Sequence, residues 1–143
     1  MGSEGWAPLG KWHIFMMNNT DVLVVDDDTD IRESISHLLE YEGYRVATAS
    51  NGVEGFQQLQ LSRPAVILLD LMMPVMDGWQ FKTEFDGKPE LNGIPIVVVS
   101  ADGNIAEKSK SIGVAEFLTK PIEIDTLLNV VQKYCSLQSP PSL

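Results

Sequence analysis

The sequence is poor in cysteine, in cationic residues and in long apolar runs. Its only cysteine is Cys135, so an intramolecular disulfide framework is excluded, and we expect a packed thiol in a reducing, cytoplasmic setting. Ten Lys and Arg residues face 20 Asp and Glu residues, and the net charge of -10 argues against direct nucleic-acid binding by this chain. No apolar run approaches the length that spans a bilayer, and no secretory signal is recognisable, so we expect no membrane contact.

The 143 residues, 44% of them hydrophobic, are enough for one domain with a real core. The apolar residues of 1–19 show no regular spacing. We expect an N-terminal extension that either was added to the natural sequence or is poorly ordered. Residues 20–137 are predicted to form the domain. Residues 138–143, which are rich in Ser and Pro, are predicted to be a C-terminal tail or the start of a linker.

From residue 21 onward, short apolar runs alternate with helical periodicity. The runs predict strands over 22–25, 45–49, 65–70, 94–99 and 115–119. Helices are expected after each strand, with Asp30 as the first cap, Val53 and Ile124 on buried faces, 87–93 as a loop and a fourth helix starting at Asn104. Alternation of this kind predicts an α/β fold with right-handed crossovers and a parallel sheet covered on both faces. Five such units favour the doubly wound, flavodoxin-like (β/α)5 arrangement with strand order 2-1-3-4-5.

Polar side chains stand at the carboxyl ends of four of the five predicted strands. Asp26 and Asp27 follow the first strand, Asp70 ends the third, Ser100 ends the fourth and Lys120 ends the fifth. Taken singly, each has an ordinary explanation as a loop residue, a helix cap or a surface lysine. Because the carboxyl ends of parallel strands meet at one sheet edge, we expect them to lie together there.

Three carboxylates in one crevice repel each other, by roughly 1 to 4 kcal/mol for each pair about 4 Å apart. A cation relieves that repulsion, and a site made of hard oxygens without His or Cys favours Mg²⁺, with Mn²⁺ as the alternative. Lys120 adds a point charge and Ser100 a hydroxyl donor. This set suits phosphoryl transfer with a carboxylate as the nucleophile.

The span from Asp21 to Leu137 resembles a receiver domain of two-component response regulators. The resemblance rests on four motifs in order, which are VVDD at 24–27, LLDLMMP at 68–74 with Asp77-Gly78, VSA at 99–101 and FLTKP at 117–121. It implies a signalling domain that catalyses only its own phosphorylation and dephosphorylation, and is not otherwise an enzyme. The phosphoryl donor would be a sensor histidine kinase or a histidine phosphotransfer protein, and the output a downstream protein target or effector domain.

The resemblance also implies roles for single residues. Asp70 would be the phosphoacceptor, and Asp26, Asp27, Asp70 and the backbone carbonyl of Met72 would hold the metal. Lys120 would pair with Asp70 and then with the phosphoryl group, and the bond between Lys120 and Pro121 is a candidate cis peptide.

Two residues would form the switch that the resemblance implies. Ser100 would move to hydrogen-bond the phosphoryl oxygen, and Phe117 would then turn inward. That movement would change the face made by the fourth helix, the fifth strand and the last helix.

Three alternatives compete with this interpretation. An aspartyl-phosphate phosphatase would need a second acid where Met72 stands, and a flavodoxin-like binding domain would need a phosphate-cradling loop where Asp26, Asp27 and Asp28 stand. A phosphorylation-independent interaction module stays open. The chain also ends some twenty residues after the lysine motif, so we expect either a stand-alone receiver or a piece of a larger regulator or hybrid kinase. Asp28 is a more natural helix cap than a further metal ligand.

Overall fold

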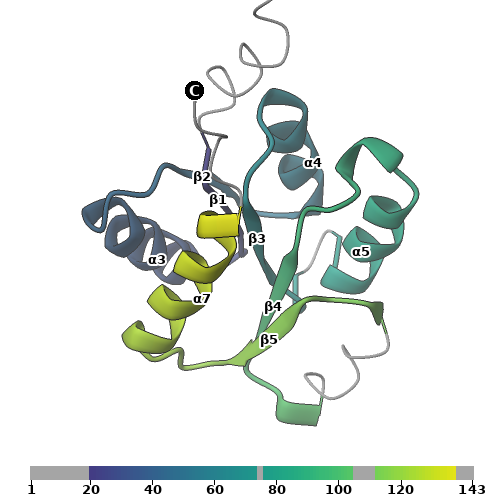
Figure 1. Cartoon of the computed structure of the whole chain (residues 1–143). Helices are drawn as coiled ribbons and strands as arrows, with labels where there is room; N and C mark the ends of the chain where they lie inside the picture. Colours follow the sequence, from purple (N-terminus) through teal and green to yellow (C-terminus); the bar gives the residue numbers. More distant parts are fainter. Residues whose placement is uncertain (1–19, 74–75, 105–111, 138–143) are drawn as a thin grey trace, which may run out of the picture.

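A computed structural model describes residues 20–73, 76–104 and 112–137 of the chain. In chain order the elements are β1 (Val22–Val25), α3 (Thr29–Tyr41), β2 (Val46–Ala49), α4 (Gly52–Leu61), β3 (Val66–Asp70), α5 (Gly78–Asp86), the 3-10 helix η2 (Pro89–Leu91), β4 (Ile96–Ser100), β5 (Glu116–Thr119) and α7 (Ile124–Leu137) (Figure 1). All strand pairs are parallel, in the order β2-β1-β3-β4-β5. The predicted sheet and its strand order are therefore confirmed.

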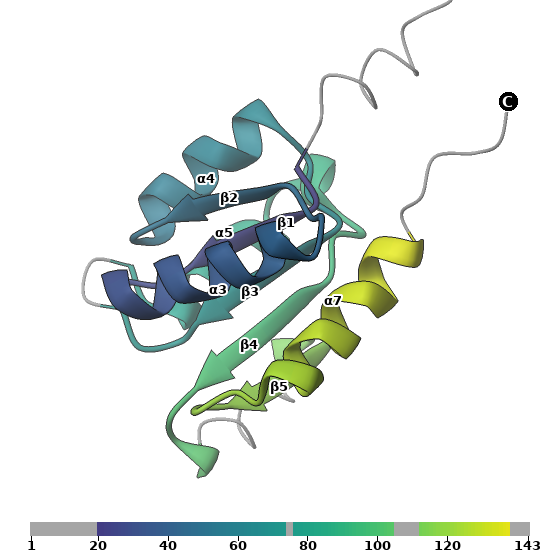
Figure 2. The same cartoon turned by 90° about the vertical axis from the view of Figure 1, so that its left-hand side faces the viewer.

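Helices cover both faces of the sheet, as the alternation of strands and helices predicted. In Figure 1, α3 and α7 lie on one side of the sheet and α4 and α5 on the other, and Figure 2 looks onto the first of these faces. Successive side chains of a strand point to opposite faces, so Val22 and Val24 pack with α3 and α7, whereas Leu23 and Val25 join the core under α5. The all-apolar strands of the sequence are the consequence of this double cover.

Helix α3 begins earlier than expected, and its cap is Asp28. The Asp28 carboxylate accepts a hydrogen bond from the backbone N–H of Ile31 at 3.1 Å, and Asp28 has the extended conformation of an N-cap. The prediction of Asp30 as the cap was wrong, because the helix starts as soon as the acidic turn ends and Asp30 already lies in its first turn. The expectation that Asp28 caps this helix is confirmed.

Two residues expected on buried helix faces are exposed. Val53 of α4 is 46% exposed, because the helix approaches the sheet through Gly52 and Gly55, which are buried. Ile124 is 58% exposed, because it is the first residue of α7 and the buried side of that helix begins at Leu127. In both helices the apolar residues recur at helical spacing as predicted, but the first apolar residue lies beyond the edge of the core.

Other boundaries moved by one or two residues. Strand β4 covers 96–100 where 94–99 was expected, Arg45 precedes β2, and the expected loop over 87–93 contains η2. The predicted helix from Asn104 lies largely in 105–111, outside the described residues, as do the predicted extension 1–19 and tail 138–143. Within the described ranges, no helix is both long and apolar enough to cross a membrane.

Candidate functional site

The carboxyl ends of four strands bring the predicted site residues to one edge of the sheet. The parallel register places Val25 beside Leu69, the residue before Asp70, and Ser100 beside Thr119, the residue before Lys120. The peptide between Lys120 and Pro121 is cis, as the resemblance implied. Residues separated by up to 94 positions along the chain are thereby in contact.

Three carboxylates form the centre of this edge. Oxygen atoms of Asp26, Asp27 and Asp70 all lie within 4.8 Å of one another. Asp26 is 2% exposed and Asp70 5% exposed, whereas Asp27 is open to solvent. Carboxylate oxygens at this spacing are the ligand type that a hard divalent cation takes, with the remaining positions left to water. The donor set therefore fits Mg²⁺.

Lys120 provides the one ammonium group that contacts the cluster among the described residues. Its Nζ lies 3.0 Å from Oδ2 of Asp26 and 3.5 Å from Oδ2 of Asp70. Burial alone lowers the pKa of Lys120, but its hydrogen bond with Asp26 and the two negative charges outweigh burial and raise the pKa overall. Lys120 therefore stays charged and bridges the ends of β1 and β3.

The surroundings of Asp70 raise the pKa of its carboxyl group. Burial raises its pKa from 3.8 to about 6, and the charge of Asp26 acts in the same direction. The backbone N–H of Met72, which donates to Oδ1 of Asp70 at 3.0 Å, and the charge of Lys120 act in the opposite direction. At neutral pH the carboxylate is ionised and poorly solvated, which favours the approach of a cation or an electrophile.

Asp26 is held from several sides, and one of its partners was missed by sequence reasoning. Its Oδ1 accepts from the N–H of Asp28 at 2.9 Å, and its own N–H donates to the carbonyl of Ala49 at 3.1 Å. Its backbone carbonyl accepts from Nη1 of Arg32 at 2.7 Å. The only sequence signal for Arg32 is a cation one turn into the helix that follows an acidic run, which a surface arginine would equally give.

Ser100 and Phe117, the two residues expected to form a switch, lie on β4 and β5. Ser100 is fully buried as the last residue of β4, and its Oγ accepts from the N–H of Asp102 at 3.1 Å. Phe117 of β5 is half-buried and packs against the core on the α4 and α5 side of the sheet. The side chain of Met72 is 59% exposed, and Met72 contacts Asp70 through its backbone N–H. Whether these residues act as expected stays a prediction.

The comparisons with known proteins agree on one family. The family model for the response regulator receiver domain matches residues 22–132. Sporulation initiation phosphotransferase F of Bacillus subtilis is 31% identical over 125 residues, which cover 86% of this chain and 99% of that protein. Response regulator MprA of Mycobacterium tuberculosis is 35% identical over 109 residues, which are 75% of this chain but 46% of MprA, so the chain spans about half of that regulator.

A solved structure leads to the same family. The chemotaxis response regulator CheY4 of Vibrio cholerae superposes with a TM-score of 0.73 at 33% identity, covering 80% of this chain and 98% of that one. The family match, the strand order and the acidic edge all concern the same residues, 22–132. The chain therefore belongs to the family of response regulator receiver domains, the phosphorelay modules of two-component signalling.

Proposed function

We propose that this domain accepts a phosphoryl group on Asp70 from a phosphohistidine of a sensor histidine kinase or a histidine phosphotransfer protein. The observation that carries the proposal is the convergence of three carboxylates within 4.8 Å, two of them bonded to Lys120. Asp26, Asp27, Asp70 and the Met72 carbonyl would hold Mg²⁺, or Mn²⁺ in its place. Three carboxylates against one ammonium leave two negative charges, which a divalent cation balances.

The chain's own residues have separate tasks in the transfer. A carboxylate oxygen of Asp70 attacks phosphorus as the bond from phosphorus to the imidazole nitrogen breaks, so the histidine leaves and an acyl phosphate forms. Lys120 neutralises charge on the phosphoryl oxygens, and the Ser100 hydroxyl donates to one of them. Bound Mg²⁺ would supply charge neutralisation and in-line orientation of the phosphoryl group.

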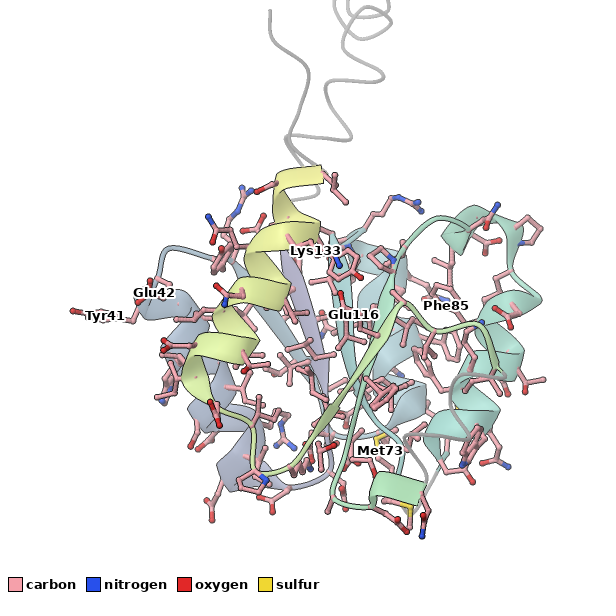
Figure 3. The ribbon with its side chains drawn as sticks, turned by 60° about the horizontal axis from the view of Figure 1, so that its bottom comes forward. Tyr41, Glu42, Met73, Phe85, Glu116 and Lys133 are labelled. Atoms are coloured by element: carbon pink, nitrogen blue, oxygen red, sulfur yellow. The ribbon has the colours of Figure 1, made fainter. Side chains whose placement is uncertain are left out.

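The output would be a change of the surface next to β5, read by a downstream protein target or an effector domain. Ser100 would shift toward the phosphoryl group, and Phe117 would follow into the space it leaves. That surface includes α7, which is tied to β5 because Glu116 accepts hydrogen bonds from Lys133 at 2.9 Å and from Tyr134 at 2.6 Å (Figure 3). Phosphorylation would bias an existing equilibrium between two arrangements of this face.

Phe117→Ala tests the switch. We expect the variant to be phosphorylated like the wild type but to lose most of the phosphorylation dependence of partner binding. Partner binding that kept its full dependence on phosphorylation in the variant would refute this role for Phe117.

We also propose a cytoplasmic location. The free thiol of Cys135 supports a reducing compartment, where cysteines stay unpaired. Burial, followed by the charge of Asp21, raises the pKa of Cys135 to about 11, so the thiol is protonated and poorly reactive.

The decisive experiment is intact mass spectrometry after incubation with acetyl phosphate and Mg²⁺. We expect a gain of one phosphoryl group that is lost with a chelator and lost in Asp70→Asn. Asp30→Asn, which removes an exposed carboxylate of α3 outside the cluster, is the matched control and should still be phosphorylated. If the folded wild type gained no mass with acetyl phosphate or with a phosphorylated histidine donor, the alternative of a phosphorylation-independent interaction module would replace this proposal.

A further inference from the structure

Arg32 lies beside the acidic edge without belonging to it. It sits in α3, half-buried, and its Nη1 donates to the backbone carbonyl of Asp26 at 2.7 Å, while Nη2 reaches the Thr29 hydroxyl at 3.4 Å. A guanidinium donor makes a charge-assisted hydrogen bond, which is stronger than one between neutral groups. The contact therefore fixes the Asp26 carbonyl against the first turn of α3.

The carbonyl that Arg32 holds belongs to the peptide between the first two acids. Because a peptide bond is planar, holding the carbonyl oxygen of Asp26 also holds the backbone N and Cα atoms of Asp27 in the same plane. The Asp26 side chain is held separately, through Asp28 and Lys120. Arg32 thus restrains the backbone from which a buried and an exposed carboxylate of the same cluster extend.

The charge of Arg32 also acts on Glu54 of α4. Hydrogen bonds from the backbone N–H and the hydroxyl of Ser50, each 2.8 Å long, are the main causes that lower the pKa of Glu54, and the charge of Arg32 contributes in the same direction. The guanidinium of Arg32 therefore acts on the end of β1 through a hydrogen bond and on a carboxylate of α4 through its charge.

We propose that Arg32 is a positioning residue for the divalent cation, which it would not contact. This inference rests on the proposed function, because it assumes that the three carboxylates bind Mg²⁺. Two effects of removing Arg32 have opposite signs. Loss of a positive charge near the acids would tighten cation binding, whereas loss of the fixed peptide would weaken it. Removing residues that orient metal ligands typically costs roughly 10- to 100-fold in metal affinity, so positioning should dominate.

Titration calorimetry of MgCl₂ into the full chain separates these effects. We expect Arg32→Met to raise the Kd for Mg²⁺ by about tenfold or more. The Kd of Arg32→Lys should lie between those of Arg32→Met and the wild type, because an ammonium keeps a charged donor but not the forked geometry. Arg45→Met is the matched control, because it removes the same charge from the ion pair with Asp21 at the opposite end of β1, and its Kd should stay within about twofold of the wild type.

The possible outcomes separate the two proposals. If the wild type binds Mg²⁺ and Arg32→Met binds it equally well or more tightly, the positioning role is overturned while the metal site stands. If Arg45→Met weakens binding as much as Arg32→Met, the role is also overturned, because the effect is then not local. If the wild type binds no Mg²⁺, the proposed metal site fails and this inference fails with it. Urea denaturation without metal checks that each variant is folded. If Arg32→Met is not folded, the Kd of Arg32→Lys for Mg²⁺ decides the question.

Discussion

Replacing Asp70 by asparagine is expected to stabilise the metal-free protein above about pH 6. Asp70 is 5% exposed, and burial is the main reason that its pKa is raised to about 6. Its ionised form is therefore unfavourable in the folded state. Asparagine keeps an oxygen that can accept from the N–H of Met72 but carries no charge, so the variant avoids this cost.

The direction of the pH dependence follows from the two pKa values. Below about pH 4 both the folded and the unfolded states hold the Asp70 proton, and ionisation contributes nothing to the difference between wild type and variant. Between 3.8 and about 6 the folded state keeps a proton that the unfolded chain has released, so wild-type stability falls as pH rises. Above that range the cost is constant.

The magnitude follows from the same interval. A raise from 3.8 to about 6 corresponds to at most about 3 kcal/mol, at 1.36 kcal/mol for each pH unit. The variant also removes one partner of Lys120, so we expect a net gain of about 1 to 3 kcal/mol in the free energy of unfolding.

Urea denaturation with a chelator, at about pH 4 and about pH 8, measures this difference by linear extrapolation. Glu33→Gln, which removes an exposed charge from α3, should show no comparable gain and controls for net charge. The argument would be refuted if Asp70→Asn were no more stable than the wild type at the higher pH. It would also be refuted if the variant were more stable by the same amount at both pH values. Saturating Mg²⁺ should reduce the difference in the free energy of unfolding between Asp70→Asn and the wild type, because a ligand at 100 times its Kd stabilises the wild type by about 2.7 kcal/mol.

Three further perturbations test other parts of the site and fold. Lys120→Met should destabilise the metal-free protein, by less than the roughly 3 to 5 kcal/mol of a fully buried broken pair. It should also lower the Kd for Mg²⁺ in calorimetry, because the competing ammonium is gone; weaker binding would contradict the charge argument. Asp28→Ala should lower the free energy of unfolding by about 1 kcal/mol through the lost cap of α3, with Mg²⁺ affinity unchanged; a large loss of affinity would make it a metal ligand instead. Gly78→Ala should lower the free energy of unfolding by about 1 to 3 kcal/mol, because a Cβ there would lie 2.7 Å from the backbone Cα of Leu71. Gly103→Ala is the control, because nothing lies within 4 Å of a Cβ at that position. Equal thermal denaturation of the two glycine variants would refute the packing argument.

The local elements of this domain were predictable because they depend on neighbours in the sequence. The unbroken apolar run before Asp70 indicates a strand covered on both faces, and β3 is buried along its whole length. Helices follow the strands as the apolar period indicated, although the first of them is capped by Asp28 and not by Asp30. The strand order followed from chain length and alternation, since right-handed crossovers leave few other arrangements.

Features that depend on how the helices sit against the sheet were not predictable. Val53 and Ile124 keep the helical apolar period but overhang the core. Sequence periodicity gives the direction of a side chain around a helix axis and not the distance of the helix end from the sheet.

The residues that meet at the functional edge could be identified from the sequence, because the carboxyl ends of parallel strands always lie on one side of a sheet. Their distances and burial depend on how the whole chain packs. The tertiary structure buries Asp70 enough to raise its pKa, brings Lys120 closer to Asp26 than to Asp70, and aims Arg32 at the Asp26 carbonyl. Burial and charge contacts arise between residues far apart in the chain, and no local pattern in the sequence encodes their distances.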